Sequence, residues 1–94
     1  MARRDEEIDT EWGEYSQRFA TSLRSSRARA GLSQEDVAYR AGLTRYTYQK
    51  YEKGESRPGA PANPTLRTLL AISQVLGVSL EELLPRPIPD LRSR

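Results

Sequence analysis

Apolar positions recur at helical spacing along most of the chain, and short breaks rich in Gly, Pro and hydroxyl residues separate the segments. Ile8, Trp12, Tyr15, Phe19 and Leu23 follow one another at intervals of three or four residues. This spacing predicts a helix over about 12–30, which the acidic residues before it either extend or leave frayed. The β-branched alternation typical of strands is absent, so the pattern predicts an all-α protein.

Caps and breakers predict four further short helices. Each follows a Ser or Thr, which favours a helix start, and three of them end at a Gly. Their ranges are about 33–41, 45–53, 66–76 and 80–84. The helix over 66–76 is apolar on more than one face and is expected at the centre of the core. Together the segments predict a compact five-helix fold.

Three stretches fall outside this helical pattern. Residues 1–14 are an acidic leader, residues 15–84 form the expected domain, and residues 85–94 end as a polar, basic tail. Within the domain, residues 55–64 carry a Pro at every third position. That spacing favours a loop with polyproline II stiffness.

Composition removes most enzyme chemistry. A chain of 94 residues is one small domain, and it contains no Cys and no His. Disulfides, the common zinc sites, Cys nucleophiles and His acid–base catalysis are therefore excluded, although a site built from carboxylates alone is not. We expect no enzymatic activity, no cofactor and no metal. No apolar run approaches the roughly 20 residues of a membrane span, and the start does not resemble a signal peptide. These features predict a cytoplasmic protein with no membrane partner.

Charge is distributed unevenly although the net charge is only +2. Residues 1–14 hold two Arg against six acids, whereas residues 15–57 hold nine basic side chains against four acids. Only two of the basic residues are Lys, and the planar donor fork of Arg suits phosphates and base edges. The middle section indicates an anionic partner, with nucleic acid as the first candidate and an ordinary solvated surface as the alternative.

The segment from Leu32 to Gly54 carries the strongest pattern. Two short capped helices are joined by Gly42-Leu43-Thr44, the arrangement of a helix-turn-helix over about 33–53. In its second helix Tyr48 and Tyr51 share one face, while Tyr46, Lys50 and Lys53 lie on the other. The outer face has the size and the donors to enter a DNA major groove.

The chain resembles the Cro and lambda-repressor type of helix-turn-helix domain, also called the XRE family, from about Phe19 to Leu84. The residues that carry the resemblance are Arg27, Gly31-Leu32-Ser33-Gln34-Glu35, Ala38, Gly42-Leu43-Thr44, Tyr51-Glu52-Lys53-Gly54, Pro64-Thr65-Leu66 and Leu76 through Leu84. The resemblance implies a five-helix fold that binds double-stranded operator DNA as a homodimer. It further implies a nucleoid-associated regulator of transcription, and we expect a repressor.

The resemblance also implies roles for individual residues. Base contacts are expected from the outer face of the second helix, and phosphate contacts from residues around it. The expected base-contacting residues are Arg45, Tyr46, Thr47 and Lys50, and the expected phosphate-contacting residues are Gln34, Thr44, Lys53 and Arg57. Gln34 is also expected to brace the first residues of the second helix. Arg27 and Glu52 match a structural pair that joins the first helix to the end of the third, with two unrelated surface charges as the alternative.

Two departures from the family pattern leave questions open. Tyr48 and Tyr51 stand where Ile or Leu is usual, so two phenol hydroxyls must reach solvent or a partner. The segment over 55–64 is longer than the usual connection, and it is expected either to follow the DNA or only to shield the core.

Ile8, Trp12 and Tyr15 lie outside the resemblance. They are expected to pack on the domain itself, with a dimer contact as the alternative. The alternative function is a protein-interaction module, such as the antitoxin of a toxin–antitoxin pair. In that case the Trp12 and Tyr15 face, or one of the tails, would grip a toxin-like or other protein partner.

Overall fold

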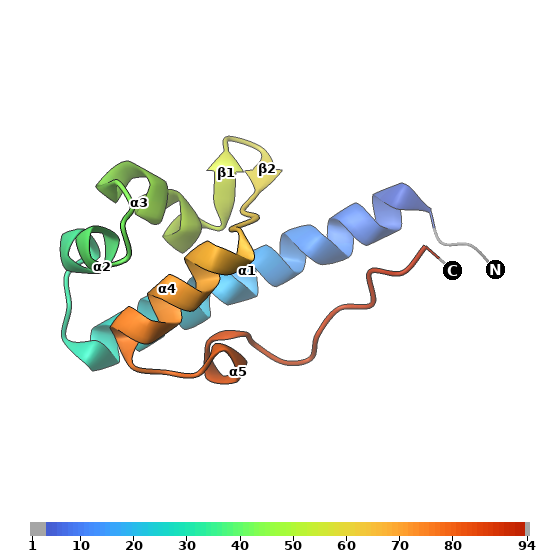
Figure 1. The fold of residues 1–94 in the computed structure, drawn as a ribbon. Helices are drawn as coiled ribbons and strands as arrows, with labels where there is room; N and C mark the ends of the chain where they lie inside the picture. Colours follow the sequence, from blue (N-terminus) through green and yellow to red (C-terminus); the bar gives the residue numbers. More distant parts are fainter. Residues whose placement is uncertain (1–3, 94) are drawn as a thin grey trace.

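The structure, a computed structural model, describes residues 4–93, which form five helices and one short hairpin (Figure 1). The elements in chain order are α1 (Asp5–Ala30), α2 (Gln34–Arg40), α3 (Arg45–Lys53), β1 (Glu55–Arg57), β2 (Ala60–Pro61), α4 (Leu66–Leu76) and α5 (Leu80–Leu83). The first three residues of the predicted leader and the last residue of the predicted tail lie outside the described range. No helix within residues 4–93 is long and apolar enough to cross a membrane.

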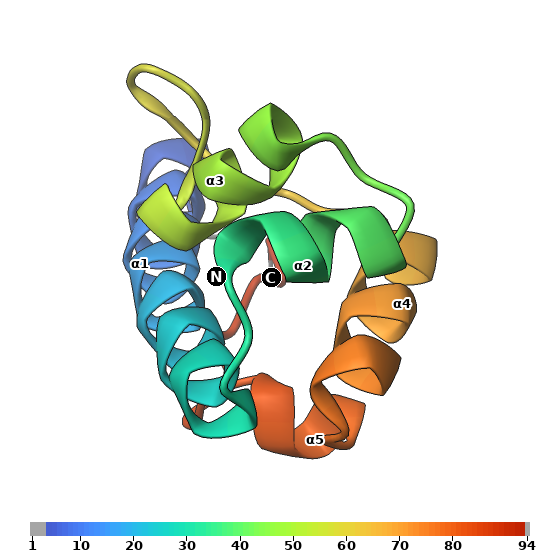
Figure 2. The ribbon, with the colours of Figure 1, turned by 90° about the vertical axis from the view of Figure 1, so that its left-hand side faces the viewer.

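One core holds all five helices together. Seen along α1, the other helices surround a common centre, with α2 and α3 adjacent to each other and α4 leading down to α5 (Figure 2). Each helix contributes a large side chain with no exposed surface, and these are Leu23, Val37, Tyr48, Ile72 and Leu83. Such burial contributes about 1.5–3 kcal/mol for each large apolar side chain. The predicted all-α, five-helix fold is therefore confirmed, with a small hairpin added to it.

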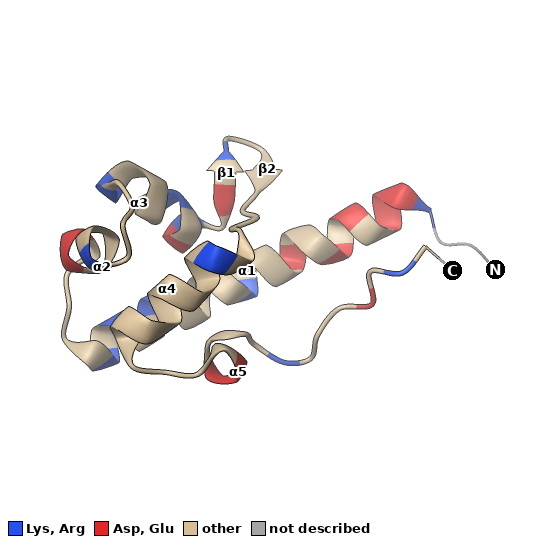
Figure 3. Cartoon of the chain, in the orientation of Figure 1, with Lys and Arg blue, Asp and Glu red and all other residues tan. Residues whose placement is uncertain are grey.

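The first helix is longer than its apolar pattern predicts. It begins at Asp5 instead of near residue 12, and it runs for 26 residues. Asp5, Glu6 and Glu7 occupy its first turn, where acidic side chains stabilise the free N–H groups and the positive end of the helix dipole. The acidic segment is therefore the helical start of α1, and it projects beyond the core (Figure 3).

The other helices start and end where their caps predict, to within one residue. Ser33 and Ser79 form reciprocal capping boxes with Asp36 and Glu82. The hydroxyl of Thr44 accepts a hydrogen bond from the Thr47 amide at 3.0 Å, and Thr65 caps α4 in the same way. These local bonds fix the ends of α2 and α3, which bear the candidate functional residues.

The Pro-rich segment is where the sequence prediction was wrong. Instead of a polyproline loop over 55–64, β1 pairs antiparallel with β2, joining Glu55 to Pro61 and Arg57 to Ala60. Pro58 and Gly59 make the turn, and Gly59 has a φ of 81°, which suits the third position of a type II turn. The Pro-Gly pair was the sequence signal for this turn, and the regular Pro spacing obscured it.

Gly54 ends α3, and the hairpin begins at the next residue. Gly54 has a φ of 75°, and a Cβ there would lie 2.6 Å from the Gln17 Nε2 atom of α1. Gln17 Nε2 donates a hydrogen bond to the Lys53 carbonyl at 3.1 Å, so α1 and the end of α3 are in close contact. Glycine suits both the positive φ and this approach, because a Cβ would require the Gln17 side chain to move.

The start of the C-terminal tail packs against α1. The Tyr15 hydroxyl donates to the Pro85 carbonyl at 3.0 Å, and an Arg18 guanidinium N–H donates to the Pro87 carbonyl at 3.1 Å. Tyr15 is buried, and the half-buried Trp12 ring stacks on it with centroids 6.1 Å apart. These aromatic side chains thus pack within their own chain, the first of the two arrangements expected for them.

Candidate nucleic-acid interface

The turn between α2 and α3 is short and well anchored. Gly42 has a φ of 75°, and the Leu43 amide donates to the Ala38 carbonyl at 2.8 Å. Leu43 packs against the hydrophobic core from this turn. Backbone bonds, a core contact and the Thr44 cap together hold the two helices in one arrangement.

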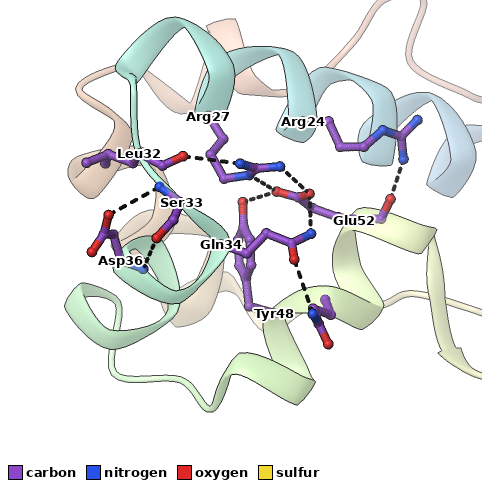
Figure 4. Close-up of polar contacts among 9 residues, drawn as sticks. Arg24, Arg27, Leu32, Ser33, Gln34, Asp36, Tyr48 and Glu52 are labelled. Carbon is purple, nitrogen blue, oxygen red and sulfur yellow. Dashed lines mark hydrogen bonds and ion pairs between the residues drawn. The ribbon is translucent and has the colours of Figure 1, made fainter.

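A buried carboxylate joins α3 to α1 (Figure 4). The Glu52 side chain is only 2% exposed, and Arg27 donates to it through Nε at 2.6 Å and through Nη2 at 3.1 Å. The Tyr48 hydroxyl, one turn earlier on α3, donates to the same carboxylate at 2.6 Å. The phenol that departs from the family pattern therefore has its partner here, and the fork of Arg27 fixes the carboxylate in a bidentate geometry.

The same carboxylate also reaches α2. Gln34 Nε2 donates to Glu52 Oε1 at 2.9 Å, and Gln34 Oε1 accepts from Gln49 Nε2 at 3.1 Å (Figure 4). Arg27 makes a further bond to the Leu32 carbonyl at 3.1 Å, just before α2 begins. One side-chain network therefore ties the C-terminal half of α1 to both helices of the helix-turn-helix. We call these side chains, Arg27, Gln34, Tyr48, Gln49 and Glu52, the Glu52 network.

The protonation states of the network follow from these contacts. Burial alone would raise the pKa of Glu52, but hydrogen bonds from Arg27, Tyr48 and Gln34 outweigh it and hold that pKa below its ordinary value. Burial and the bond to Glu52 raise the pKa of the Tyr48 phenol. At neutral pH the network therefore holds a charged carboxylate, a charged guanidinium and a neutral phenol. Every buried side-chain polar atom within residues 4–93 has a hydrogen-bond partner.

The outer face of α3 differs from the Glu52 network, because it is basic and largely exposed. Arg45 and Lys53 are exposed at its two ends, and Tyr46 is 69% exposed between them. The Lys50 ammonium lies 4.4 Å from the centroid of the Tyr46 ring, a cation–π distance that couples the two side chains. The single acid of α3, Glu52, points inward to Arg27 (Figure 4), so the outward side chains of α3 are basic, aromatic or neutral.

The remaining predicted site residues surround this face. Thr44 is exposed and Thr47 is half-buried, and their hydroxyls are 3.0 Å apart at the start of α3. Arg57 is exposed on the hairpin, which follows directly from the end of α3 (Figure 3). Gln34 is half-buried, and its side chain braces Gln49 in the second turn of α3 instead of the first residues of that helix.

Two contributors were not predicted from the sequence. Gln49 belongs to the Glu52 network, and Arg24 donates one hydrogen bond to the Glu52 backbone carbonyl and another to the Thr21 hydroxyl at 3.1 Å. Helical spacing does place Gln49 on the same side of α3 as Arg45 and Lys53. Its bond to Gln34 has no signal in the sequence, because it depends on how closely α2 and α3 approach.

This arrangement defines a helix-turn-helix protein, a class whose second helix enters the major groove of DNA. Residues 18–85 match the model of the helix-turn-helix domain family, and the chain belongs to that family.

Two regulators of Bacillus subtilis (strain 168) are similar in sequence. The SPbeta prophage-derived uncharacterized HTH-type transcriptional regulator YonR is 41% identical over 66 residues, which cover 70% of this chain and 56% of that protein. The uncharacterized HTH-type transcriptional regulator YqaE is 36% identical over 66 residues, covering 70% of this chain and 52% of that protein. The chain thus spans about half the length of these curated relatives.

A solved structure supports the same family. The restriction-modification controller protein C.AhdI from Aeromonas hydrophila superimposes with a TM-score of 0.63 at 31% identity. The match covers 72% of this chain and 94% of that one. The fold and the family are therefore those of helix-turn-helix regulators of the XRE type.

Proposed function

We propose that this chain is a sequence-specific, double-stranded-DNA-binding transcriptional regulator that acts as a homodimer, with α3 in the major groove. The observation that carries the proposal is the outer face of α3, which presents Arg45, Tyr46 and Lys50 without an acid. The Glu52 network holds that face at a fixed angle to the rest of the domain. A rigid helix with outward donors is what direct readout of base edges requires.

The contacts divide into two kinds. Arg45, Tyr46, Lys50 and Thr47 are proposed to contact bases, because they lie on or beside the outer face of α3. The proposed phosphate-contacting residues lie around it and are Gln34, Thr44, Lys53 and Arg57. Phosphate contacts position the protein, and base contacts carry the sequence preference.

The dimer and the direction of regulation are further parts of the proposal. Two copies of α3 would read half-sites about one helical turn of DNA apart, and an occupied operator would repress transcription by excluding other proteins. The protein would act in the cytoplasm by binding alone, without a cofactor and without catalysing a reaction. An antitoxin-like grip on a partner through Trp12 and Tyr15 is disfavoured, because the tail already contacts Tyr15.

The test is selection of binding sites from a random pool of duplex DNA by the purified chain. We expect a twofold-symmetric preferred site that binds two chains. Lys50→Ala should cost about 1–3 kcal/mol on that site and relax the preference at one or two base pairs per half-site. Arg92→Ala is the charge control, because Arg92 lies on the tail and pairs with Asp90. Recovery of no preferred sequence, or equal effects of the two variants, would contradict the proposal.

A further inference from the structure

Gln49 lies on α3 but is not among the proposed base-contacting residues. It lies one helical turn after Arg45 and one turn before Lys53, and it directly precedes Lys50. Its side chain is half-buried and lines a surface hollow together with Arg24, Gln34 and Lys53. Gln49 therefore borders the outward face while remaining in contact with the Glu52 network.

The orientation of the Gln49 amide is determined from within the protein. A carboxylate accepts hydrogen bonds and donates none, so Gln34 must turn its NH₂ group toward Glu52, at 2.9 Å. The Gln34 carbonyl oxygen then faces Gln49, which must present its own NH₂ group, at 3.1 Å. Flipping the Gln49 amide would set two carbonyl oxygens against each other. The carboxylate therefore removes the usual twofold ambiguity of a glutamine amide.

The bond to Gln34 leaves part of the Gln49 amide unused. A primary amide has two N–H donors and one carbonyl acceptor, and only one N–H is engaged. Within residues 4–93 the Gln49 Oε1 atom has no hydrogen-bond partner. The remaining N–H donor and the carbonyl acceptor are the groups with which a glutamine side chain binds the N7 acceptor and the N6 donor of adenine in the major groove.

We infer that Gln49 reads an adenine in each half-site, and that Gln34 is the positioning residue that orients it through Glu52. This inference rests on the proposed function and deepens it, because it assigns a base to a residue that the sequence did not single out. Gln34 then has two tasks, since its remaining N–H is available to a DNA phosphate while its carbonyl fixes Gln49.

The experiment compares site preferences and affinities of the full chain, three single variants and the Gln34→Met/Gln49→Met double variant. Gln49→Met keeps the length of the side chain but removes the amide, and Gln34→Met removes the bond that orients it. Gln74→Met is the matched control, because Gln74 is an exposed glutamine on α4. Thermal melts of all proteins check that each variant is folded.

We expect Gln49→Met to lose the adenine preference at one position per half-site and to bind the wild-type site roughly tenfold more weakly. Gln34→Met should relax the same position, and the double variant should be no worse there than Gln49→Met alone. The control should keep the wild-type profile. A purely structural role for Gln34 would lower the melting temperature without changing the base preference.

A second measurement changes the DNA and starts from the wild-type protein. Each adenine of the selected site is replaced in turn by 7-deazaadenine, which lacks the N7 acceptor. Wild-type protein should lose roughly tenfold in affinity at one adenine per half-site, and Gln49→Met should be insensitive there. An unchanged profile for Gln49→Met, or no sensitive adenine for the wild type, overturns the inference. An effect of Gln49→Met that Gln34→Met does not share overturns the positioning role. If the wild type selects no site at all, the proposed function itself fails.

Discussion

The same kind of ion pair occurs at the two ends of α1 in opposite surroundings. Near its C-terminal end Arg27 meets Glu52 at 2.6 Å, with side chains 23% and 2% exposed. Near its N-terminal end Arg4 meets Glu6 at 3.6 Å, with both side chains 77% exposed. The first pair joins α1 to α3 and, through Gln34, to α2, whereas the second joins neighbouring residues in water. An ion pair therefore holds elements of the fold together when it is buried and joins different helices, and its charges alone are not enough.

The same contrast holds for the two ends of the molecule. The end that carries α2 and α3 presents basic side chains around α3, while the far end of α1 is mainly acidic (Figure 3). The molecule extends 45 Å along its longest axis, several times the screening length at physiological salt. The acidic end should therefore have little direct effect on DNA at the proposed binding face of α3. At low salt, where screening is weaker, its field should favour approach with the basic end first.

The largest expected effect is that of salt on DNA affinity, because only one end of the molecule is basic. Binding through the basic end displaces counterions from DNA, so affinity should fall steeply as salt rises. For a dimer that contacts roughly 6–10 phosphates, the loss between 50 and 200 mM salt is about 10³–10⁵ in affinity. Fluorescence anisotropy with the selected site measures it. An affinity that stays constant over this range would contradict binding through phosphates.

Removing one acid from each ion pair should separate the buried pair from the exposed one. Glu52→Ala leaves Arg27 without its carboxylate and the buried Tyr48 hydroxyl without its acceptor, so we expect a loss of about 3–5 kcal/mol in the free energy of unfolding. Glu6→Ala, the matched change at the other end, should cost about 0–1 kcal/mol.

Urea melts of these proteins, of Arg27→Ala and of the double variant measure the coupling. The loss in the double variant should be less than the sum of the single losses at Arg27 and Glu52. Strictly additive losses would mean that the pair does not interact in solution.

Acid should act on the buried pair through the pKa of Glu52. Because that pKa is lower in the folded chain than its ordinary value of 4.5, the unfolded chain binds the proton first as pH falls. The stabilisation is therefore complete above about pH 5 and is lost as pH falls from there through the folded-state pKa. Urea midpoints between pH 2.5 and 7 should decline in this range, and Glu52→Gln should have a shallower decline. Parallel curves for the two proteins would assign the acid sensitivity to other groups.

The hairpin should contribute to DNA affinity through the charge of Arg57, and it should not contribute to the base preference. Arg57→Ala should weaken binding to all DNA sequences alike and reduce the salt slope by about 1 for each protomer. Binding at several salt concentrations, to the selected site and to an unrelated duplex, measures this. A changed base preference in Arg57→Ala would instead make the hairpin a reading element.

The smallest effect is expected from the acidic end itself. A chain that starts at Trp12 lacks Asp5, Glu6, Glu7, Asp9 and Glu11 but keeps the core intact. It should bind DNA somewhat more tightly at low salt, by less than about tenfold, with the difference vanishing near 200 mM salt. A large gain that persists at high salt would mean that the acidic end contacts the DNA-binding face.

The sequence predicted best those features that depend on residues close to one another in the chain. Helix ends were predictable because Ser33, Thr44 and Gly54 act on their own neighbours. The α1 extension was underestimated because its stabilisation comes from acids in the first turn and not from apolar spacing. The hairpin was missed because the three Pro residues suggested an extended segment, while the Pro58-Gly59 turn decides the path.

The candidate site divides in the same way. The outward positions of α3 follow from helical periodicity, and family resemblance placed Arg27 and Glu52 together. The bonds from Tyr48 to Glu52 and from Gln49 to Gln34 join side chains whose meeting depends on packing. The position of Gln34 could be predicted, but its choice of Gln49 over the first turn of α3 could not, because it depends on the distance between two helices.

The inward anchoring of α3 has a consequence for protein engineering. Because the docking angle is set by Arg27, Tyr48 and Glu52, the exposed position 46 and its neighbour 50 take little part in holding the helix. A combinatorial library that varies these two positions should therefore retain folded members in high proportion. Such a library would turn this small chain into a source of reagents with new operator preferences.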